Sequence, residues 1–384
     1  MGKKVLYIIA NLRVSNGVTS VIMNQYEKLI HSGYIIDFCA MYSWGSPHIK
    51  TILSNGGHYY VLPQINGFRN IVDTDESHER LGMPDKKAAY NYYKEIMDAG
   101  NYDIVHVHIL GRYAYLALKA AKKCNVRVRI FHSHNPKQRY NLKASLYSYV
   151  FDNACVLYAN KYAACSSIAG ETMFGKRAYQ IIHNTIDTSS YRYDNSVRDK
   201  IRKDLKIDPG AFVIGTVCRQ TYQKNPFFIL DIFKEILYRD PNAILLWIGT
   251  GELEKETKDY SINCGINNSV IFLGNRSDVQ SMYSAMDAFY LPSLFEGLGI
   301  VFIEAQAAGV RVFASNVVPR DTNVTDLIQY LPLSKEAGFW ASEIVKTKGI
   351  EVDRKHYSEI VKQSDFDKNN NTDIIRFYAE LTEE

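Results

Sequence analysis

The residues best suited to chemistry lie between positions 291 and 315, where two carboxylates and two glycines surround the start of a predicted helix. Glu296 and Glu304 are separated by seven residues, and the glycines follow the first of them. Because glycine has no side chain, backbone N–H groups here can approach an anion closely, and such a helix start binds phosphate. The residues whose N–H groups are available for this are Gly297, Leu298, Gly299, Ile300 and Val301.

Buried strands are predicted on both sides of this stretch, at 288–291 and 310–314. The order strand, loop, helix, strand is half of a parallel α/β sheet. A simpler interpretation is that Ser293 and Glu296 form a capping box and that Glu304 is a solvated helix residue. Two glycines in the supposed first turn disfavour an ordinary capped helix, because each costs roughly 1 kcal/mol relative to Ala.

The run from Leu291 to Ser315 resembles the signature of the retaining GT-B glycosyltransferases of glycosyltransferase family 4. The resemblance covers nearly the whole chain and is strongest from Phe212 to Ser315. It implies that Glu296 contacts the donor sugar as a catalytic residue and that Glu304 contacts the ribose hydroxyls. It also implies a retaining, metal-independent hexosyltransferase.

Length and pattern agree with two domains. A chain of 384 residues suits two α/β domains, and predicted strands and helices alternate along it. The fold implied by the resemblance is GT-B, with two Rossmann-like doubly wound domains facing a central cleft. We expect an acceptor-binding domain over 1–188, a donor-binding domain over 189–363, and a C-terminal helix over 364–384 that returns to the first domain.

Two cations follow the predicted strand 212–218. Arg219 lies five residues before Lys224, at a switch from strand to helix, where open α/β sheets bind ligands. Arg offers a planar fork of donors and Lys a point charge, so the pair suits a diphosphate. The alternative is a pair of solvated charges. In the resembled family this pair holds the leaving nucleotide diphosphate, which implies a catalytic role for both.

Other donor contacts follow from the resemblance alone. Gly17 is implied to lie beneath the donor diphosphate, although a simple turn glycine is the alternative. Asn275 and Arg276 are implied to meet the nucleotide base. The run Gly249-Thr-Gly251 begins like a dinucleotide fingerprint, but Glu254 occupies the third glycine position, which disfavours a nicotinamide site.

Two His-x-His pairs end neighbouring predicted strands, His106 with His108 and His132 with His134, and Asn135 follows the second pair. Residues two apart on a strand share a face, so each pair could offer two metal ligands. A metal-dependent hydrolase of the amidohydrolase type is therefore an alternative, but its first pair belongs on the first strand, which has no His here. The resemblance instead implies a catalytic role for His108 beside the transferred sugar. It leaves His132, His134 and Asn135 on the acceptor side of the cleft.

We expect no cofactor and no required metal. An Asp-x-Asp pair after a buried strand could hold a metal. The pairs in this chain begin instead at Asp73, in a predicted loop, and at Asp365, at a predicted helix start. The implied substrate is a nucleotide diphosphate sugar, UDP-linked in our interpretation, and the implied acceptor is a glycan or lipid-linked glycan of capsule or exopolysaccharide synthesis. A catalytically silent nucleotide-sugar-binding protein is a third hypothesis, disfavoured because the matched side chains are intact.

Composition narrows the setting. Six cysteines form no C-x-x-C pair, no apolar run approaches the roughly 20 residues of a membrane span, and no secretory signal is recognisable, so we expect a cytoplasmic protein. The net charge is only +4, yet 104–151 contains no acidic residue. The region 112–143 is basic and interleaved with tyrosines, which suits nucleic acid or an anionic membrane. Because the resemblance implies a sugar transferase, we expect this region to contact the inner face of the plasma membrane and not nucleic acid. The alternative is an ordinary solvated surface.

Overall fold

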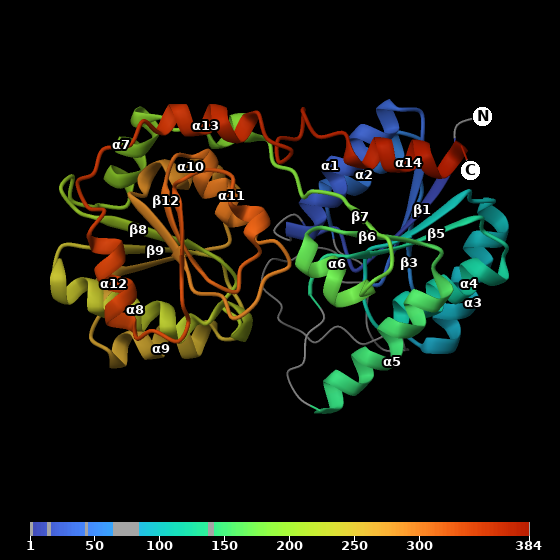
Figure 1. Ribbon diagram of the computed structural model, residues 1–384, viewed down its shortest axis with the longest axis horizontal. Helices are drawn as coiled ribbons and strands as arrows, with labels where there is room; N and C mark the ends of the chain where they lie inside the picture. The colour runs from blue at the N-terminus through green and yellow to red at the C-terminus, as the bar shows by residue number, and fades with distance from the viewer. Residues whose placement is uncertain (1–2, 14–16, 43–44, 64–83, 137–141, 384) are drawn as a thin grey trace. The chain divides into compact units, whose positions relative to one another are not determined.

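The computed structural model describes residues 3–13, 17–42, 45–63, 84–136 and 142–383. The chain divides into two compact α/β units, the first formed by Met1–His183 with Thr372–Glu384 and the second by Asn184–Asn371 (Figure 1). Each unit contains one parallel sheet with a reversal in strand order. This confirms the expected fold class of two doubly wound α/β domains.

The sheet of the first unit is parallel and has the order β3-β2-β1-β4-β5-β6-β7. Its strands are β1 (Lys4–Ile9), β2 (Ile35–Ala40), β3 (Tyr59–Val61), β4 (Ile104–Val107), β5 (Val128–Ser133), β6 (Lys161–Ala164) and β7 (Gln180–Ile181). The central strands are almost entirely buried, which explains why they read as apolar runs in the sequence. Strand order reverses between β1 and β4, so the loops after these two strands diverge there.

The helices of the first unit are α1 (Gly17–His31), α2 (Pro47–Ser54), α3 (Lys86–Gly100), α4 (Arg112–Lys123), α5 (Leu142–Tyr158), α6 (Ser167–Phe174) and α14 (Asp373–Glu383). Helix α14 lies beside α1 and buries Ile374, Phe377, Tyr378 and Leu381 in the core of this unit (Figure 1). Their spacing places them on one helical face. The C-terminal helix therefore packs on the first unit, as the resemblance implied.

The start of that last helix differs from the expectation. The expected helix over 364–384 begins only at Asp373, and the preceding residues through Asn371 belong to the second unit. The Asp367 carboxylate accepts bonds from the Thr188 hydroxyl and from the Asn369 amide, and the Asn371 side chain donates to the carbonyl of Asp365. The two local bonds use the Asn369 N–H and the Asp365 carbonyl, which are backbone groups that a helix would need.

The sheet of the second unit is also parallel, with the order β10-β9-β8-β11-β12-β13. Its strands are β8 (Val213–Val217), β9 (Ile244–Ile248), β10 (Val270–Gly274), β11 (Ala288–Leu291), β12 (Arg311–Ser315) and β13 (Ile328–Leu331). Its helices are α7 (Asn195–Asp204), α8 (Pro226–Arg239), α9 (Glu254–Asn263), α10 (Val279–Ala285), α11 (Ile300–Ala307), α12 (Ala337–Val345) and α13 (Arg354–Lys362). The order reverses between β8 and β11, so the crevice for a ligand is expected at their carboxyl ends.

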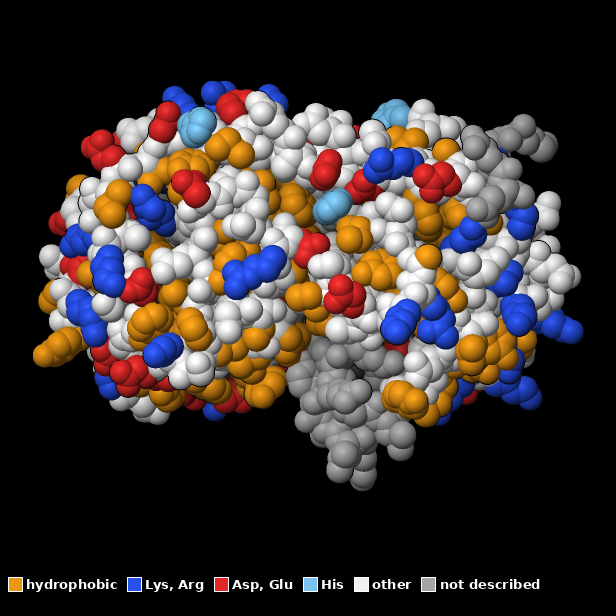
Figure 2. All heavy atoms as spheres, viewed as in Figure 1, with side chains coloured by type: hydrophobic (Ala, Val, Ile, Leu, Met, Phe, Trp, Pro, Cys, Tyr) orange, Lys and Arg blue, Asp and Glu red, His pale blue; other side chains and the backbone are white. Residues whose placement is uncertain are grey.

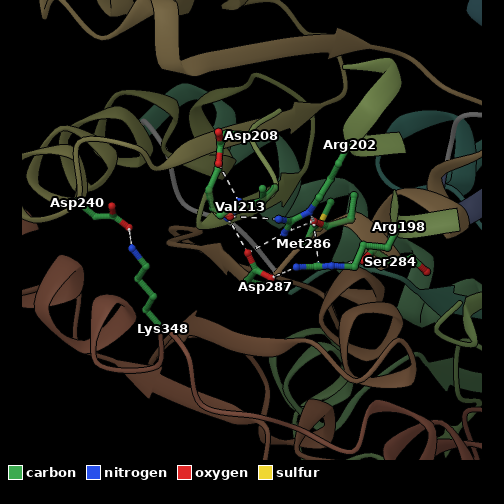
Figure 3. A network of polar contacts seen from close by, with 12 residues as sticks. Arg198, Arg202, Asp208, Val213, Asp240, Ser284, Met286, Asp287 and Lys348 are labelled. Atoms are coloured by element: carbon green, nitrogen blue, oxygen red, sulfur yellow. Dashed lines mark hydrogen bonds and ion pairs between the residues drawn. The ribbon is translucent and has the colours of Figure 1, made fainter. Parts of the chain in front are cut away.

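A polar network fixes the amino ends of the same two strands (Figure 3). Asp287 directly precedes β11, and its carboxylate accepts bonds from Arg198 at 2.6 Å, from Arg202 at 2.8 Å and from the Val213 amide at 2.8 Å. Arg202 is 5% exposed and also donates to the carbonyl of Ala285. The network therefore lies at the opposite end of the strands from the candidate ligand crevice.

Candidate active site at the carboxyl ends of the second sheet

A largely buried ion pair joins the two loops at the strand reversal. The Lys224 ammonium donates to Glu296 Oε1 at 2.5 Å, and the side chains of the two residues are 14% and 5% exposed. Lys224 follows β8 and Glu296 follows β11. Since β8 and β11 are neighbours, their carboxyl ends bring together two residues that are 72 positions apart. Of the predicted donor residues, these two make direct side-chain contact.

Polar neighbours hold the Glu296 loop in place. The Ser293 hydroxyl donates to Glu296 Oε1 at 2.6 Å, and the Ser315 hydroxyl donates to the carbonyl of Ser293 at 2.6 Å. The Gln223 amide donates to the carbonyl of Phe295 at 3.0 Å and to Glu296 Oε2 at 3.4 Å. The carboxylate is therefore preorganised by three strand-end loops, which is what a site for a charged ligand requires.

Glu304 lies on the helix that follows this loop. Tyr283 donates to Glu304 Oε2 at 2.7 Å, and Tyr191 forms a second side-chain hydrogen bond to the same carboxylate. Burial raises the pKa of Glu304 above its ordinary value of 4.5, while the two tyrosine bonds act in the opposite direction. Glu304 is therefore a positioned, partly buried acid, and the interpretation of it as a solvated helix residue is wrong.

Helix α11 begins without a capping box. Its N-cap is Gly299, with φ 85° and ψ 63° and no side-chain cap bond, and the helix starts at Ile300. A Cβ at Gly299 would lie 2.6 Å from the Phe302 ring, so glycine is required both by conformation and by space. Ser293 and Glu296 precede the cap and bond to each other instead. The amides of Ile300 and Val301 belong to the first turn, which lacks intrahelical acceptors.

Arg219 directly follows Cys218, just past the end of β8, and its side chain is exposed. Its guanidinium forms no hydrogen bond or ion pair with any of the described residues. The positive charges of Lys224 and Arg219 both act to lower the pKa of the Cys218 thiol, although burial dominates and raises that pKa to about 12. Both cations therefore act on the same end of β8.

The two glycines of the Gly249-Thr-Gly251 turn have a packing reason. A Cβ at Gly249 would lie 2.2 Å from the Cys218 carbonyl oxygen, and one at Gly251 would lie 2.3 Å from that of Gln220. The turn after β9 therefore packs closely on the loop that carries Arg219. This supports its interpretation as a short structural turn rather than a dinucleotide fingerprint.

The weaker donor candidates are less centrally placed. Asn275 and Arg276 follow β10 at the sheet edge, and Arg276 is engaged by Asp278 through two bonds of 2.7 Å. Gly17 is the first residue of α1 in the first unit, and a Cβ there would meet no atom within 4 Å. Its neighbour Asn16 lies outside the described residues.

The histidines of the first unit converge. His106, His108, His132 and His134 are at most 8% exposed, and His108 Nδ1 lies 3.0 Å from His134 Nε2. Asn135 follows them, and its carbonyl accepts a bond from the Ser133 hydroxyl at 2.8 Å. The two His-x-His pairs therefore form one cluster, in which ring nitrogens of His106, His108 and His132 could hold a metal ion. The roles implied for His108, His132, His134 and Asn135 stay predictions.

Several supporting residues carry no signal in the sequence. Gln223, Ser315, Tyr191 and Tyr283 each bond a predicted site residue or its loop. Only the position of Gln223, directly before Lys224 in a charged loop, could have predicted that it lies at the site. The tyrosines come from a 3-10 turn (Thr188–Tyr191) and from α10, and only the folded chain brings them to Glu304.

Comparison with known proteins shows what the chain is similar to. Residues 197–328 match the family model described as "Glycosyl transferases group 1". A protein of Bacillus subtilis strain 168, "Putative glycosyltransferase EpsF", is 26% identical over 382 residues, which are 97% of this chain and 95% of that protein. An Escherichia coli "UDP-Gal:alpha-D-GlcNAc-diphosphoundecaprenol alpha-1,3-galactosyltransferase" is 28% identical over 250 residues, covering 61% of this chain and 63% of its own.

A solved structure shows the same fold. Anabaena Alr3699/HepE, in complex with UDP and glucose, superimposes with a TM-score of 0.75 at 18% identity, covering 98% of this chain and 100% of its own. The ion pair of Lys224 with Glu296 and the start of α11 all lie within the matched residues 197–328. Within the second unit, residues 197–328 are therefore similar to the glycosyltransferase group 1 family, and the whole chain has the GT-B fold.

Proposed function

We propose that this protein is a retaining glycosyltransferase that moves a hexose from a UDP-sugar to a glycan or lipid-linked glycan in cell-surface polysaccharide synthesis. The observation that carries the proposal is the Lys224–Glu296 pair at the strand reversal of the second sheet, within the residues that match the group 1 family model. The name of the Escherichia coli relative specifies a UDP-sugar donor and a lipid-diphosphate acceptor, and the Anabaena structure contains UDP and glucose. Both support a donor of this class.

The charges suit the expected chemistry. Breaking the bond between sugar and phosphate leaves negative charge on the diphosphate and positive charge on the sugar ring. Lys224, Arg219 and the first amides of α11 supply fixed positive charge for the diphosphate, and Glu296 supplies negative charge for the sugar. Because protein cations fill this role, we propose that transfer needs no metal and no cofactor. We propose that the leaving phosphate takes the acceptor proton on the same face, which would retain the anomeric configuration.

A thermal-shift screen tests the donor class. UDP, GDP, ADP and their hexose conjugates are added to the full chain, and the unfolding midpoint is recorded for each. A ligand present at 100 times its Kd stabilises the folded state by about 2.7 kcal/mol, which moves the midpoint by several degrees. We expect UDP and one UDP-sugar to give the largest shifts. Equal shifts for all three diphosphates would contradict the UDP assignment, and no shift at all would contradict the donor site.

We expect Glu304→Gln to raise the KM for the donor roughly tenfold or more, because one charge-assisted bond to a ribose hydroxyl is lost. The raised pKa gives a second expectation for stability. Because the pKa of Glu304 is higher in the folded state, protonated Glu304 adds to the free energy of unfolding. This stabilisation is complete below pH 4.5, the ordinary pKa, and is lost as pH rises through the pKa of the folded state. Gln cannot ionise, so the variant should lose less stability than wild type as pH rises above 4.5.

Donor kinetics and urea unfolding at several pH values check both statements. Glu343→Gln is the matched control, because Glu343 is a surface acid of α12 paired with Lys346. An unchanged donor KM in Glu304→Gln would remove Glu304 from the donor site.

The basic region 112–143 is the surface that we relate to the acceptor. Of this region, residues 137–141 lie outside the described residues. Not all of its charges are available, because Arg127 donates to the Leu381 carbonyl and Arg129 to the Tyr158 carbonyl. Lys122 and Lys123 at the end of α4 are exposed, and the adjacent α5 exposes Tyr149 and Leu157 at 59% and 70%. Lys and Arg side chains are interspersed with hydrophobic ones over this part of the first unit (Figure 2). None of the described helices has the length and apolarity that crossing a bilayer requires.

We propose that this surface contacts the anionic inner face of the plasma membrane, where a lipid-linked acceptor would lie. We expect Lys122→Gln with Lys123→Gln to weaken sedimentation with phosphatidylserine-containing liposomes by roughly tenfold or more, since each surface cation adds to the attraction. The control is Lys200→Gln with Lys203→Gln on α7 of the second unit. Wild-type chain that fails to sediment at low salt would overturn the membrane proposal without affecting the donor site.

A further inference from the structure

Four imidazoles and a phenol share one face of the first sheet. In the register of the sheet Tyr7 is paired with His106, and His106 with Ile130. Side chains two positions apart on a strand point to the same face, so His108 lies on that face after His106. His132 and His134 follow Ile130 by two and four positions and lie there too. The four histidines, named the histidine cluster below, are His106, His108, His132 and His134.

Hydrogen bonds engage only some of the ring nitrogens in the cluster. His106 Nε2 lies 3.1 Å from His132 Nδ1, and His108 Nδ1 lies 3.0 Å from His134 Nε2. His108 Nε2, His132 Nε2 and His134 Nδ1 are buried and have no hydrogen-bond partner among the described residues. Native proteins rarely leave buried polar atoms without a partner, so three such atoms in one cluster call for a ligand.

We propose that the histidine cluster binds one transition-metal ion of the Zn²⁺ class, through imidazole nitrogens of His106, His108 and His132. One ligand atom from each of these three residues already lies within 4.8 Å of the others. In a tetrahedral zinc site, with bonds of about 2.0–2.1 Å, ligand nitrogens are about 3.4 Å apart. The widest pair would therefore close by about 1.4 Å, a distance that side-chain rotation can supply. His134 is the remaining nearby donor for a fourth position.

The donor set of the cluster favours particular metals. A set of imidazole ligands suits Zn, Cu, Co or Ni rather than Mg or Ca, which prefer oxygen.

Tyr378 orients one of the ligands. Its hydroxyl lies 2.8 Å from His106 Nδ1 and 3.5 Å from the Tyr7 hydroxyl, and Tyr378 is fully buried. If His106 donates through Nδ1, its Nε2 presents a lone pair toward His132. Outer partners of this kind fix the tautomer of a metal-binding histidine. Since Tyr378 lies on α14, metal binding would depend on the docking of the C-terminal helix on this unit.

The proposed ion is separate from the sugar-transfer chemistry. It takes up His108, so its presence would compete with any role of that residue in transfer, and we expect Zn²⁺ to inhibit rather than to activate. The binding itself requires no nucleotide or sugar. Failure of the metal proposal would therefore leave the donor site untouched, and failure of the donor site would leave the metal proposal untouched.

Titration of the chelator-treated full chain with Co²⁺ tests the site. We expect one equivalent to produce the strong visible absorption of a tetrahedral Co²⁺ site and Zn²⁺ to displace it. His132→Ala removes a ligand and should weaken binding by at least roughly tenfold, and Tyr378→Phe should weaken it roughly 10- to 100-fold through His106. His31→Ala is the control, because His31 lies at the exposed end of α1 and should bind like wild type.

Circular dichroism of each metal-free variant shows whether it has folded, and Tyr378→Phe serves if His132→Ala does not fold. Loss of the tetrahedral signal in His132→Ala or in Tyr378→Phe, with retention in His31→Ala, supports the site. Absence of that signal in wild type, or equal Co²⁺ affinity in every folded variant, would overturn it.

Discussion

Lys224→Met and Glu296→Gln are each expected to lower the rate of sugar transfer by about 10²- to 10³-fold, the usual effect of removing one preorganised charge that stabilises a transition state. Lys224 is the largely buried cation past the end of β8, and Glu296 is its partner at 2.5 Å. Initial rates with a saturating UDP-sugar measure the effect. Lys234→Met is the control and should keep the wild-type rate, because Lys234 is an exposed lysine on α8, the helix that follows Lys224.

The same pair also contributes to stability, and a double variant separates the two effects. Removing one partner leaves the other charge largely buried and unpaired. We therefore expect each single variant to lose about 3–5 kcal/mol of the free energy of unfolding. The double variant Lys224→Met with Glu296→Gln leaves no unpaired charge, so we expect it to recover most of the lost stability. It should not recover transfer. Recovery of both, or wild-type rates in either single variant, would show that the pair is structural only.

Asp287→Ala is expected to destabilise the second unit by about 3–5 kcal/mol, because Arg202 would keep a buried charge without its carboxylate. Three donors converge on Asp287, and its own amide donates to the Val213 carbonyl at 2.7 Å, so the residue joins the starts of β8 and β11 (Figure 3). Urea unfolding followed by tryptophan fluorescence reports on this unit, since Trp247 and Trp340 are buried in it.

Figure 3 also contains the control for this experiment. Lys348 donates to Asp240 at 2.7 Å, and the Lys348 side chain is 44% exposed whereas that of Asp240 is 9% exposed. Lys348→Met removes one donor from a carboxylate, whereas Asp287→Ala removes a carboxylate that three donors share, so Lys348→Met should cost less stability than Asp287→Ala. A loss in Asp287→Ala no greater than in Lys348→Met would contradict the role assigned to the network.

Much of the fold could be predicted because parallel strands are buried on both faces. Val5, Leu6, Tyr7 and Ile8 are fully buried, so β1 reads as a continuous apolar run. Helix α13 gave no such signal, because its buried residues are only Ser358 and Val361 and no apolar stripe marks it. Strand β7 has two residues, too few for a period. The last helix was predicted too early because hydrogen bonds around Asp367 interrupt an otherwise suitable sequence.

The sequence also predicted the site residues singly but not how they pair. Lys224 meets Glu296 because β8 and β11 are neighbours, and a sheet order of this kind cannot be read from one chain. The same holds for the two His-x-His pairs, which converge because β4 and β5 are adjacent. Patterns along a chain predict elements, whereas contacts between distant loops follow from topology.

The most direct test of the central claim, that the end of β8 binds the diphosphate of a nucleotide donor, is calorimetric titration of Arg219→Met with UDP and with uridine. Loss of one charge-assisted contact should weaken UDP binding roughly tenfold or more. Uridine has no phosphate, so its affinity should not change, and the exposed Arg192→Met should bind both ligands like wild type. An unchanged affinity for UDP, or an equal loss for UDP and uridine, would contradict the claim.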